Sequence, residues 1–411
     1  MSYMDKLLEG VKVEWKSLWQ VTTWDKKFNS VSNLKQPNII KYPYLLATDL
    51  FKLEQENGDV FLLSTGEHTG WTTEALAGSY LCKGEVISIP WGKSRPVKDV
   101  LKYYNGKFVT ADNRIATSND VNVLLNKFLY YCMLGQSSVI DSFYRGSGIK
   151  HPSMANLLDM KIPIPPIEVQ KEIVRILDTF TELTAELTAE LTARKKQYSY
   201  YREKLLSFKE GEVEWKTLGE IAKIQRGASP RPIAKFITND TNSIPWIKIG
   251  DTTPHLKYIT HTKQKISYEG AKKSRILKKG DFIISNSMSF GRPYILGIDG
   301  AIHDGWASIS NFGNKLNSDY LYHYLSSEIV QNYWLSKINS GSVSNLNADI
   351  IKSLQIPIPP LDEQERIVSI LDKFDTLTTS ISEGLPKEIE LRKKQYEYYR
   401  DMLLTFPKEN I

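Results

Sequence analysis

Cysteine is scarce in this sequence: only Cys82 and Cys132 occur, and they form no CxxC pair. The scarcity argues against a disulfide-stabilised scaffold and a thiolate zinc site, and it is typical of a reducing compartment. The N-terminus has no basic segment followed by an apolar one, and no apolar run approaches membrane-spanning length. We therefore expect a cytoplasmic protein without a membrane segment.

Motifs that carry chemistry are also missing. Gly92-Lys93-Ser94 resembles the end of a phosphate-binding loop, but Ile87 stands where the first glycine is required. The sequence lacks the Asn/Asp-Pro-Pro-Tyr/Phe run of adenine methyltransferases, and its six histidines show no metal-ligand spacing. No nucleophile and base stand in a catalytic pattern. We therefore predict a binding protein with no catalytic residues and no metal site.

Length and charge set broad limits on what the protein is. At 411 residues the chain exceeds one ordinary domain, so we expect two or three. Hydrophobic residues make up 41% of the sequence, which is enough for more than one core. The net charge of +6 is compatible with a polyanionic partner, although many enzymes have a similar charge.

The chain repeats itself. Residues 162–166 read IPIPP and recur at 356–360, an offset of 194 (356 − 162). Residues 194–198 read RKKQY and recur at 392–396, an offset of 198 (392 − 194). Globular and helical segments therefore alternate twice, which predicts a pseudo-two-fold internal repeat.

The repeat wraps from the C-terminus to the N-terminus. The segment GEVEWKTLGEI begins at Gly211, directly after the first helical segment, and its counterpart opens the protein at residues 10–18. Glu214-Trp215-Lys216 looks like half of a nuclease site, but Glu14-Trp15-Lys16 recurs at the equivalent position. We therefore interpret both triplets as a structural joint.

Each helical segment carries an apolar seam. Apolar residues recur at steps of three and four after Pro166, which predicts one long helix from Ile167 to Phe208. The second copy has the same spacing, but Gly384-Leu385-Pro386 predicts a break or tight turn. We expect the helices to pair antiparallel as a coiled coil; the alternative is that each packs on its own domain. The seam residues are Ile173, Leu177, Phe180, Leu183, Leu187, Leu191 and Tyr198, then Ile367, Leu371, Phe374, Leu377 and Tyr396.

The globular segments combine strands and helices. β-rich stretches at 85–89 and 281–285 each follow a glycine, and helix-like runs occur at 123–133 and 321–335. The fold class predicted is α+β, with two mixed α/β domains joined by two long antiparallel helices. The expected boundaries are 1–160 for the first domain, 161–211 for the first helical spacer, 212–354 for the second domain and 355–411 for the second helical spacer.

These features resemble the specificity subunit of a Type I restriction-modification system. The resemblance is carried by the two IPIPP blocks with the following Q-x-x-IV-x-ILD-x-F, the two RKKQY-x-YYR blocks and GEVEWKTLGEI. GASPRPIAKF, IPWIKIGD, LKKGDFIISNS and GAIHDGWASI in the second globular segment resemble target recognition domains, whereas the first segment is more divergent. The tandem TAEL unit resembles a subfamily whose central helix carries this unit in differing copy number.

The resemblance implies separate roles for this chain and for its partner subunits. Each target recognition domain would read one half of a bipartite, asymmetric site in double-stranded DNA. The helices would set the gap and dock two methyltransferase (modification) subunits, which use S-adenosylmethionine to methylate adenine at N6. Two restriction (translocase and nuclease) subunits would use ATP and magnesium, while this chain would be no enzyme and hold no cofactor.

Two alternatives from other functional classes stay open. One is a DNA methyltransferase or nuclease with an unrecognised site, and the other is a coiled-coil scaffold without a DNA role. For DNA binding, basic loop residues are candidates for phosphate contacts, and Arg or Asn for base contacts. For any single residue, an ordinary solvated charge is the simpler interpretation. The candidates are Lys93, Arg95, Lys98, Arg114, Arg145, Arg226, Arg231, Lys235, Lys263, Lys265, Lys272, Lys273, Arg275, Asn286 and Arg292.

The TAELTAELTA run at 184–193 can be interpreted through its effect on helix length. Leu183, Leu187 and Leu191 are spaced four and four, whereas a heptad seam alternates three and four. Ala, Glu and Leu favour helices, so an added unit lengthens the helix by about 6 Å without breaking it. We therefore interpret the run as an adjustable spacer.

Overall fold

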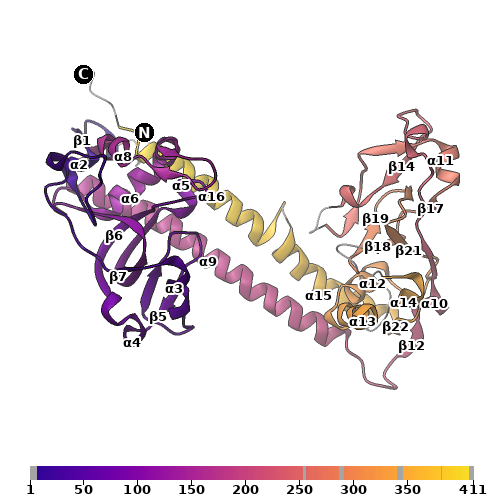
Figure 1. The fold of residues 1–411 in the computed structure, drawn as a ribbon. Coiled ribbons are helices and arrows are strands. Elements are labelled where there is room, and N and C mark those ends of the chain that lie inside the picture. The colour runs from indigo at the N-terminus through magenta and orange to yellow at the C-terminus, as the bar shows by residue number, and fades with distance from the viewer. Residues whose placement is uncertain (1–6, 253–255, 287–290, 340–345, 381, 407–411) are drawn as a thin grey trace. The chain divides into compact units, whose positions relative to one another are not determined.

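The computed structural model describes residues 7–252, 256–286, 291–339, 346–380 and 382–406. Its internal contacts divide the chain into two compact units (Figure 1). Unit 1 comprises Met1–Thr184 and Arg392–Ile411, and unit 2 comprises Ala185–Leu391. Each unit therefore combines one globular segment with parts of the long helices.

Unit 1 is built on a sheet whose apolar side chains meet a helix. The sheet has the order β2-β8-β6-β7-β4-β5, with β3 added beside β7. Ile87 of β6, Phe128 of α6 and Leu177 of the long helix α9 belong to one buried cluster. The elements are β1 (Glu14–Ser17), α2 (Leu18–Val21), β2 (Thr22–Trp24), β3 (Tyr44–Leu45), α3 (Ala47–Leu50), β4 (Val60–Leu63), β5 (Gly70–Thr72), α4 (Glu74–Ala77), β6 (Cys82–Pro90), α5 (Val97–Val100), β7 (Lys102–Ala111), β8 (Asn113–Ser118), α6 (Asn126–Gly135), α7 (Ser137–Ser142), β9 (Tyr144–Arg145), β10 (His151–Pro152), α8 (Met154–Asp159), β11 (Lys161–Ile164) and α9 (Ile167–Leu206).

Unit 2 contains two larger sheets, with the orders β13-β21-β18-β19-β15 and β16-β14-β20-β17, beside the two-stranded pair β12-β22. Phe282 of β18, Tyr320 of α12 and Leu371 of α15 share one buried cluster. The elements are β12 (Glu214–Thr217), α10 (Leu218–Ile221), β13 (Lys223–Arg226), β14 (Ile244–Ile247), β15 (Tyr258–Ile259), β16 (Gln264–Ile266), α11 (Tyr268–Lys272), β17 (Arg275–Leu277), β18 (Phe282–Ser285), β19 (Pro293–Leu296), β20 (Gly300–Ile302), β21 (Trp306–Ser310), α12 (Ser318–Leu325), α13 (Glu328–Asn339), α14 (Ala348–Lys352), β22 (Gln355–Ile358), α15 (Leu361–Thr379) and α16 (Gly384–Leu403), the last of which ends in unit 1.

The same two-stranded joint closes both globular segments. β1 pairs antiparallel with β11 so that Glu14 lies opposite Ile164, and β12 pairs with β22 so that Glu214 lies opposite Ile358. Each strand that opens a repeat thus lies beside the strand that leads into the following helix. The Glu-Trp-Lys triplets are therefore parts of a structural joint, as their recurrence predicts.

A glutamine follows each joint and makes equivalent hydrogen bonds. Nε2 of Gln170 donates to the carbonyls of Val123 and Pro165, both at 2.8 Å. Nε2 of Gln364 donates to the carbonyls of Lys315 and Pro359, at 2.9 and 2.8 Å. Both glutamines are fully buried, so each locks a loop of its globular segment to the start of its helix.

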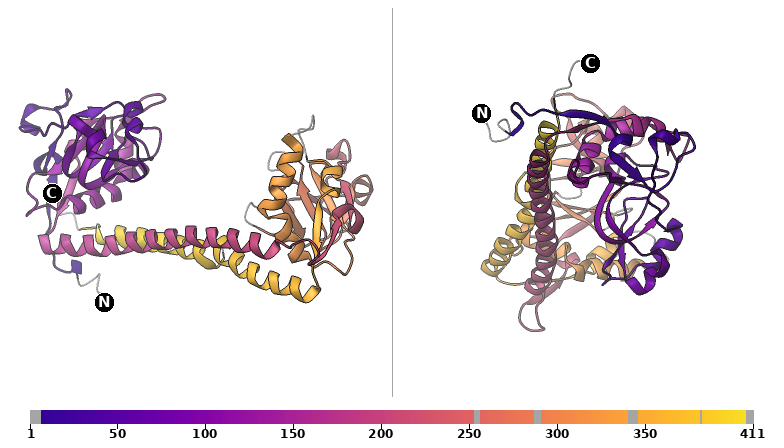
Figure 2. Two further views of the ribbon diagram at one scale, coloured as in Figure 1. Left: turned by 90° about the horizontal axis from the view of Figure 1, so that it is seen from below. Right: turned by 90° about the vertical axis from the view of Figure 1, so that its left-hand side faces the viewer.

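The long helices pack antiparallel within each unit (Figure 2). In unit 1, Phe180 of α9 stacks on Tyr399 of α16 with ring centroids 5.3 Å apart. In unit 2, Leu191 of α9 lies in one groove with Pro386, whereas Tyr201 stacks on Phe374 of α15 at 5.7 Å. Residue numbers therefore rise along α9 while they fall along its partner.

The predicted helix limits agree closely with the structure. α9 runs unbroken over 40 residues and ends two residues before Phe208. The second helix breaks where the sequence predicts it, because α15 ends at Thr379 and α16 starts at Gly384, whose φ of +78° suits glycine.

The seam residues differ in exposure along the helices. Ile173, Leu177, Tyr198, Ile367 and Leu371 are buried. Around the TAEL units the seam is more open, with Leu183 38% exposed. The half-buried members are Phe180, Leu187, Leu191, Phe374, Leu377 and Tyr396.

The α+β fold with two sheet-based domains and long packed helices is confirmed. The strand expected at 85–89 is the end of β6, and the one at 281–285 is β18. The helical run at 321–335 is instead split into α12 and α13. The four-segment division and the pseudo-two-fold relation stay predictions. Within the described ranges, no helix is both long and apolar enough to cross a bilayer.

Candidate nucleic-acid interface

A cluster of loops in unit 1 forms where β6 ends. The segment after Pro90 pairs with the segment before β10, since the amide of Lys93 donates to the carbonyl of Lys150 at 3.0 Å and the reverse bond measures 3.1 Å. β10 in turn pairs antiparallel with β9, with His151 directly opposite Arg145. Two loops far apart in sequence are thus joined into one surface.

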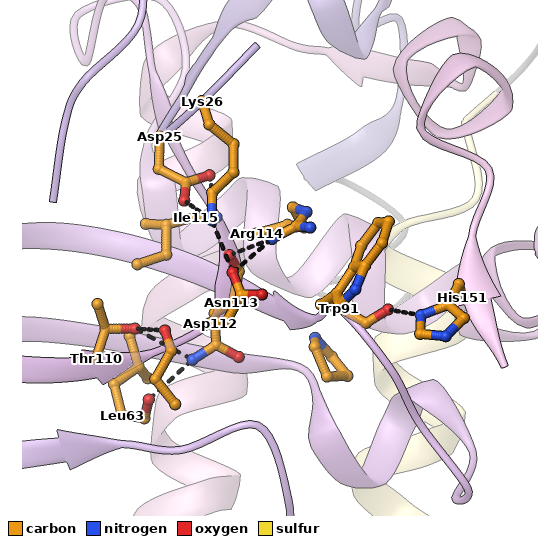
Figure 3. Close-up of polar contacts among 12 residues, drawn as sticks. Asp25, Lys26, Leu63, Trp91, Thr110, Asp112, Asn113, Arg114, Ile115 and His151 are labelled. Carbon is orange, nitrogen blue, oxygen red and sulfur yellow. Dashed lines mark hydrogen bonds and ion pairs between the residues drawn. The ribbon is translucent and has the colours of Figure 1, made fainter. Parts of the chain in front are cut away.

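Trp91 stands between two side chains in this cluster (Figure 3). The guanidinium carbon of Arg114 lies 4.0 Å from the centre of the indole, and the ring of His151 lies 4.9 Å from it. The indole is nevertheless 39% exposed. An exposed aromatic ring held by a cation and an imidazole is a firmly positioned contact surface.

The side chain of Arg114 is paired with the carboxylate of Asp112. Its Nη1 donates to Asp112 at 2.9 Å, and Lys26 donates to the same carboxylate at 2.8 Å. Burial would raise the pKa of Asp112, but the hydrogen bond from Lys26 and the charge of Arg114 outweigh it, so that pKa is lowered. Burial does raise the pKa of neighbouring Asp25, despite Lys26. Because the Arg114 side chain is only 8% exposed, it supports Trp91 from within the protein.

The hydrogen bond of His151 fixes its tautomer. Nδ1 lies 2.9 Å from the carbonyl oxygen of Trp91 (Figure 3). A carbonyl only accepts, so Nδ1 carries the hydrogen and, in the neutral ring, Nε2 is an acceptor. His151 is exposed, which leaves that acceptor accessible to a partner.

The remaining candidates of unit 1 fall into two groups. Lys93 is 7% exposed, pairs with Asp141 and lies 4.6 Å from the ring centre of Tyr144. Arg95 pairs with Glu67 at the surface. Within the described part of the chain, the exposed side chains of Lys98 and Arg145 form no ion pair.

Asp304 gathers three candidates of unit 2 at the turn before β21. Its carbonyl accepts from Nε of Arg226 at 3.3 Å and from Nδ2 of Asn286 at 3.4 Å, and its carboxylate lies 3.5 Å from Arg231. Burial would raise the pKa of Asp304, but the hydrogen bond from Ser229 and nearby positive charge lower it. Asn286 is buried, whereas the two arginines are exposed.

A second basic group of unit 2 covers the smaller sheet. Lys265 lies on β16, Lys272 on α11 and Arg275 on β17, at both edges of the sheet β16-β14-β20-β17. Lys272 and Lys273 lie over the rings of Tyr268 and Phe236, at 4.6 and 4.8 Å. Arg292 stands apart, half-buried over Tyr294. The exposed members, which form no ion pair with a described residue, are Lys235, Lys263, Lys265, Lys272, Lys273 and Arg275.

Sequence reasoning missed Trp91 and His151. Trp91 directly precedes the Gly92-Lys93-Ser94 motif, and His151 follows the Gly146-Ser147-Gly148 loop that connects β9 to β10. Nothing in the local pattern at either position indicates that the two are neighbours. A tryptophan and a histidine, each beside a glycine-containing loop, were the only local signal.

Comparisons of the sequence and of the fold with known proteins find the same kind of protein. A family model described as the Type I restriction modification DNA specificity domain matches residues 38–194 and 210–391. The type I restriction enzyme EcoR124I/EcoR124II specificity subunit of Escherichia coli is 37% identical over 430 residues, covering 99% of this chain and 98% of that protein. A putative type I restriction enzyme specificity subunit of Haemophilus influenzae is 35% identical and covers 98% of both. The crystal structure of a Type I restriction-modification S subunit from M. genitalium matches with a TM-score of 0.59 at 17% identity, over 99% of this chain and 100% of that one.

Proposed function

Because this chain belongs to the DNA specificity subunits of Type I restriction-modification systems, the non-catalytic subunits of those complexes, we propose that each unit reads one half of a bipartite, asymmetric DNA site. The observation that carries this proposal is a constant frame around two different surfaces. Gln170 and Gln364 anchor both globular segments by the same hydrogen bonds. The candidate surfaces differ, with Trp91 and His151 in unit 1 and the Asp304 cluster in unit 2.

Phosphate contacts supply most of the affinity for DNA, and base contacts supply the sequence preference. We assign phosphate contacts to Lys98 in unit 1 and to the exposed group on the smaller sheet of unit 2, all of which are basic residues that form no ion pair with a described residue. Lys93 and Arg114 are buried and held by carboxylates, so we leave them out of the contact surface.

Two equivalent exposed tyrosines support docking of two identical partners. Tyr200 is 59% exposed and Tyr398 is 65% exposed, at the same position of the two RKKQY-x-YYR blocks. Each packs edge-on against the following tyrosine at 5.3 Å, and that tyrosine stacks inward on a phenylalanine of the other helix. The inward tyrosine is explained by internal packing, but the outward one is not. We assign the outward tyrosines to two methyltransferase subunits.

The rest of the assembly follows from that assignment. The methyltransferase subunits would bind S-adenosylmethionine, and two restriction subunits would bring ATP and magnesium. This chain would contribute no cofactor and act in the cytoplasm. α9 would set the distance between the two half-sites, and its TAEL units would adjust it.

Reconstitution tests the proposed function. The purified chain is combined with its methyltransferase subunits, and adenine methylation is mapped on a library of duplexes. We expect methylation only by the complex, and only at a site with two fixed halves and an unread gap. Methyl transfer by the chain alone would indicate a catalytic protein, and absence of any preferred bipartite site would indicate a scaffold without a reading function.

A further inference from the structure

The pair β9 and β10 in unit 1 forms a short ribbon with two exposed polar side chains. Arg145 and His151 lie directly opposite each other across the pair, so they share one face of the ribbon. The connecting turn passes through Gly146 and Gly148, whose φ values of +131° and +89° suit glycine. All residues from Arg145 to His151 are exposed. The ribbon therefore presents one exposed face that carries both side chains.

The base of the ribbon is firmly attached to the unit. The hydroxyl of Tyr144, which is 5% exposed, donates to the carbonyl of Pro90 at 2.9 Å. Lys93 and Lys150 exchange two backbone hydrogen bonds. Nδ1 of His151 donates to the carbonyl of Trp91, whose ring also packs on the imidazole. Side chains supported in this way keep their geometry when a partner approaches.

The two side chains offer complementary chemistry to base edges. The major groove of B-DNA admits a two-stranded β-ribbon. An arginine donates to O6 and N7 of guanine, and the acceptor Nε2 of neutral His151 matches the amino group of adenine or cytosine. Opposite side chains on a ribbon stand about 5 Å apart at Cβ, whereas base pairs stack every 3.4 Å or so. The pair is thus spaced to reach neighbouring base pairs.

We propose that the ribbon β9–β10 enters the major groove and reads two neighbouring base pairs of the half-site of unit 1. Arg145 binds a guanine, and His151 accepts from the exocyclic amino group of an adenine or cytosine. Trp91, held by Arg114, positions the imidazole. The inference rests on the proposed function, because it names the residues through which one unit reads its half-site.

The test uses the chain reconstituted with its methyltransferase subunits. Initial methylation rates are measured on duplex libraries in which one half-site at a time is randomised. The variants are Arg145→Ala with His151→Ala, and Arg145→Lys, which keeps the charge but loses the two-point contact with guanine. The control is Lys83→Ala, an exposed residue near the start of β6, about 26 Å along the strand from Trp91.

In the double variant we expect discrimination at two adjacent positions of one half-site to fall about tenfold or more, while the other half-site is read as before. Arg145→Lys should lose discrimination at one of those positions, and Lys83→Ala should change nothing. The thermal unfolding midpoint of each variant complex should match the unmodified one, because the substituted side chains are exposed.

Three results would overturn the inference. They are an unchanged preference in both half-sites of the double variant, an equal loss in both half-sites, and a uniform loss of rate on every sequence, which indicates a phosphate contact. If the unmodified complex prefers no bipartite site, the proposed function itself fails. If the unmodified complex does prefer a bipartite site and the variants give one of these three results, the inference about β9–β10 is wrong and the proposed function stands.

Discussion

Gln170 and Gln364 occupy the same position of the two repeats, and each accepts one backbone N–H and donates to two carbonyls. Their Oε1 atoms accept from the amides of Leu125 and Asn317, at 3.0 and 2.8 Å. Each glutamine thus bonds one buried and two partly buried backbone groups at the point where a globular segment meets its helix. The frame is repeated in atomic detail although the surrounding domains have diverged.

Replacing either glutamine should destabilise its unit. Gln170→Met or Gln364→Met keeps the volume but leaves one buried and two partly buried backbone groups without their partner, so we expect a loss of about 3 kcal/mol in the free energy of unfolding. Urea denaturation measures this loss. Gln395→Met is the matched control, because Gln395 is exposed and should change stability by less than about 0.5 kcal/mol. Equal losses in all three variants would argue against the buried network.

His323 should make unit 2 sensitive to mild acid. It is fully buried; Tyr198 lies 3.3 Å from its Nδ1 and Asp372 lies 2.7 Å from its Nε2. Burial lowers the pKa of His323, although the hydrogen bond to Asp372 opposes the shift. The unfolded chain therefore binds the proton more readily, and the stability present at neutral pH is lost as the pH falls below about 6.5.

The free energy of unfolding, measured between pH 7.5 and 5, should fall by at most about 1.4 kcal/mol per pH unit because of His323. His323→Gln should flatten the curve in this window, whereas His261→Gln, at an exposed histidine of the same unit, should keep it. Asp372 affects stability at lower pH than His323 does. Burial raises its pKa, but the hydrogen bonds with His323 and Lys257 lower it overall, so its contribution is lost only below about pH 4.

The outward tyrosines should control assembly with the methyltransferase subunits. Tyr200→Ser and Tyr398→Ser remove an exposed ring each, and a central interface tyrosine typically contributes about 1–2 kcal/mol. We expect each single variant to weaken one of two binding events and the double variant to weaken both, as counted by native mass spectrometry. Tyr268→Ser, at a residue 58% exposed on α11, is the control. Normal two-partner assembly of the double variant would remove this docking assignment.

Deleting one TAEL unit should shorten the unread gap between the two DNA half-sites without changing either half-site. Removal of residues 188–191 shortens α9 by about 6 Å, and DNA advances about 3.4 Å per base pair. We therefore expect methylation mapping to find the unread gap shorter by about one to two base pairs, with both half-sites unchanged. Altered half-site bases at the old gap length would show that the run is not a spacer.

The frame of this protein was predictable because its signals are local. Pro165-Pro166 marks the start of α9, Gly384 marks the break, and the steps of three and four define the helices between them. The recurrence of one motif in two contexts predicts the joint from the sequence alone.

The candidate interface was less predictable, because it depends on contacts distant in sequence. Trp91 and His151 are 60 residues apart and meet only through the pairing of Lys93 with Lys150. Charge alone also does not indicate burial, since Lys93 and Arg114 are candidates by charge but the structure buries their side chains against carboxylates. The split between α12 and α13 was missed because the apolar pattern continues across it.

The division of unit 1 between the two ends of the chain has a consequence for biosynthesis. Leu403 is fully buried and Phe406 is 6% exposed in the core of that unit, yet both are translated only after the whole of unit 2. Between Thr184 and Arg392 the ribosome adds 207 residues (391 − 185 + 1), which takes about 10–40 s at bacterial rates. The nascent first domain must wait through this interval with part of its core uncovered. Unit 2, by contrast, is contiguous and can complete its fold as it emerges.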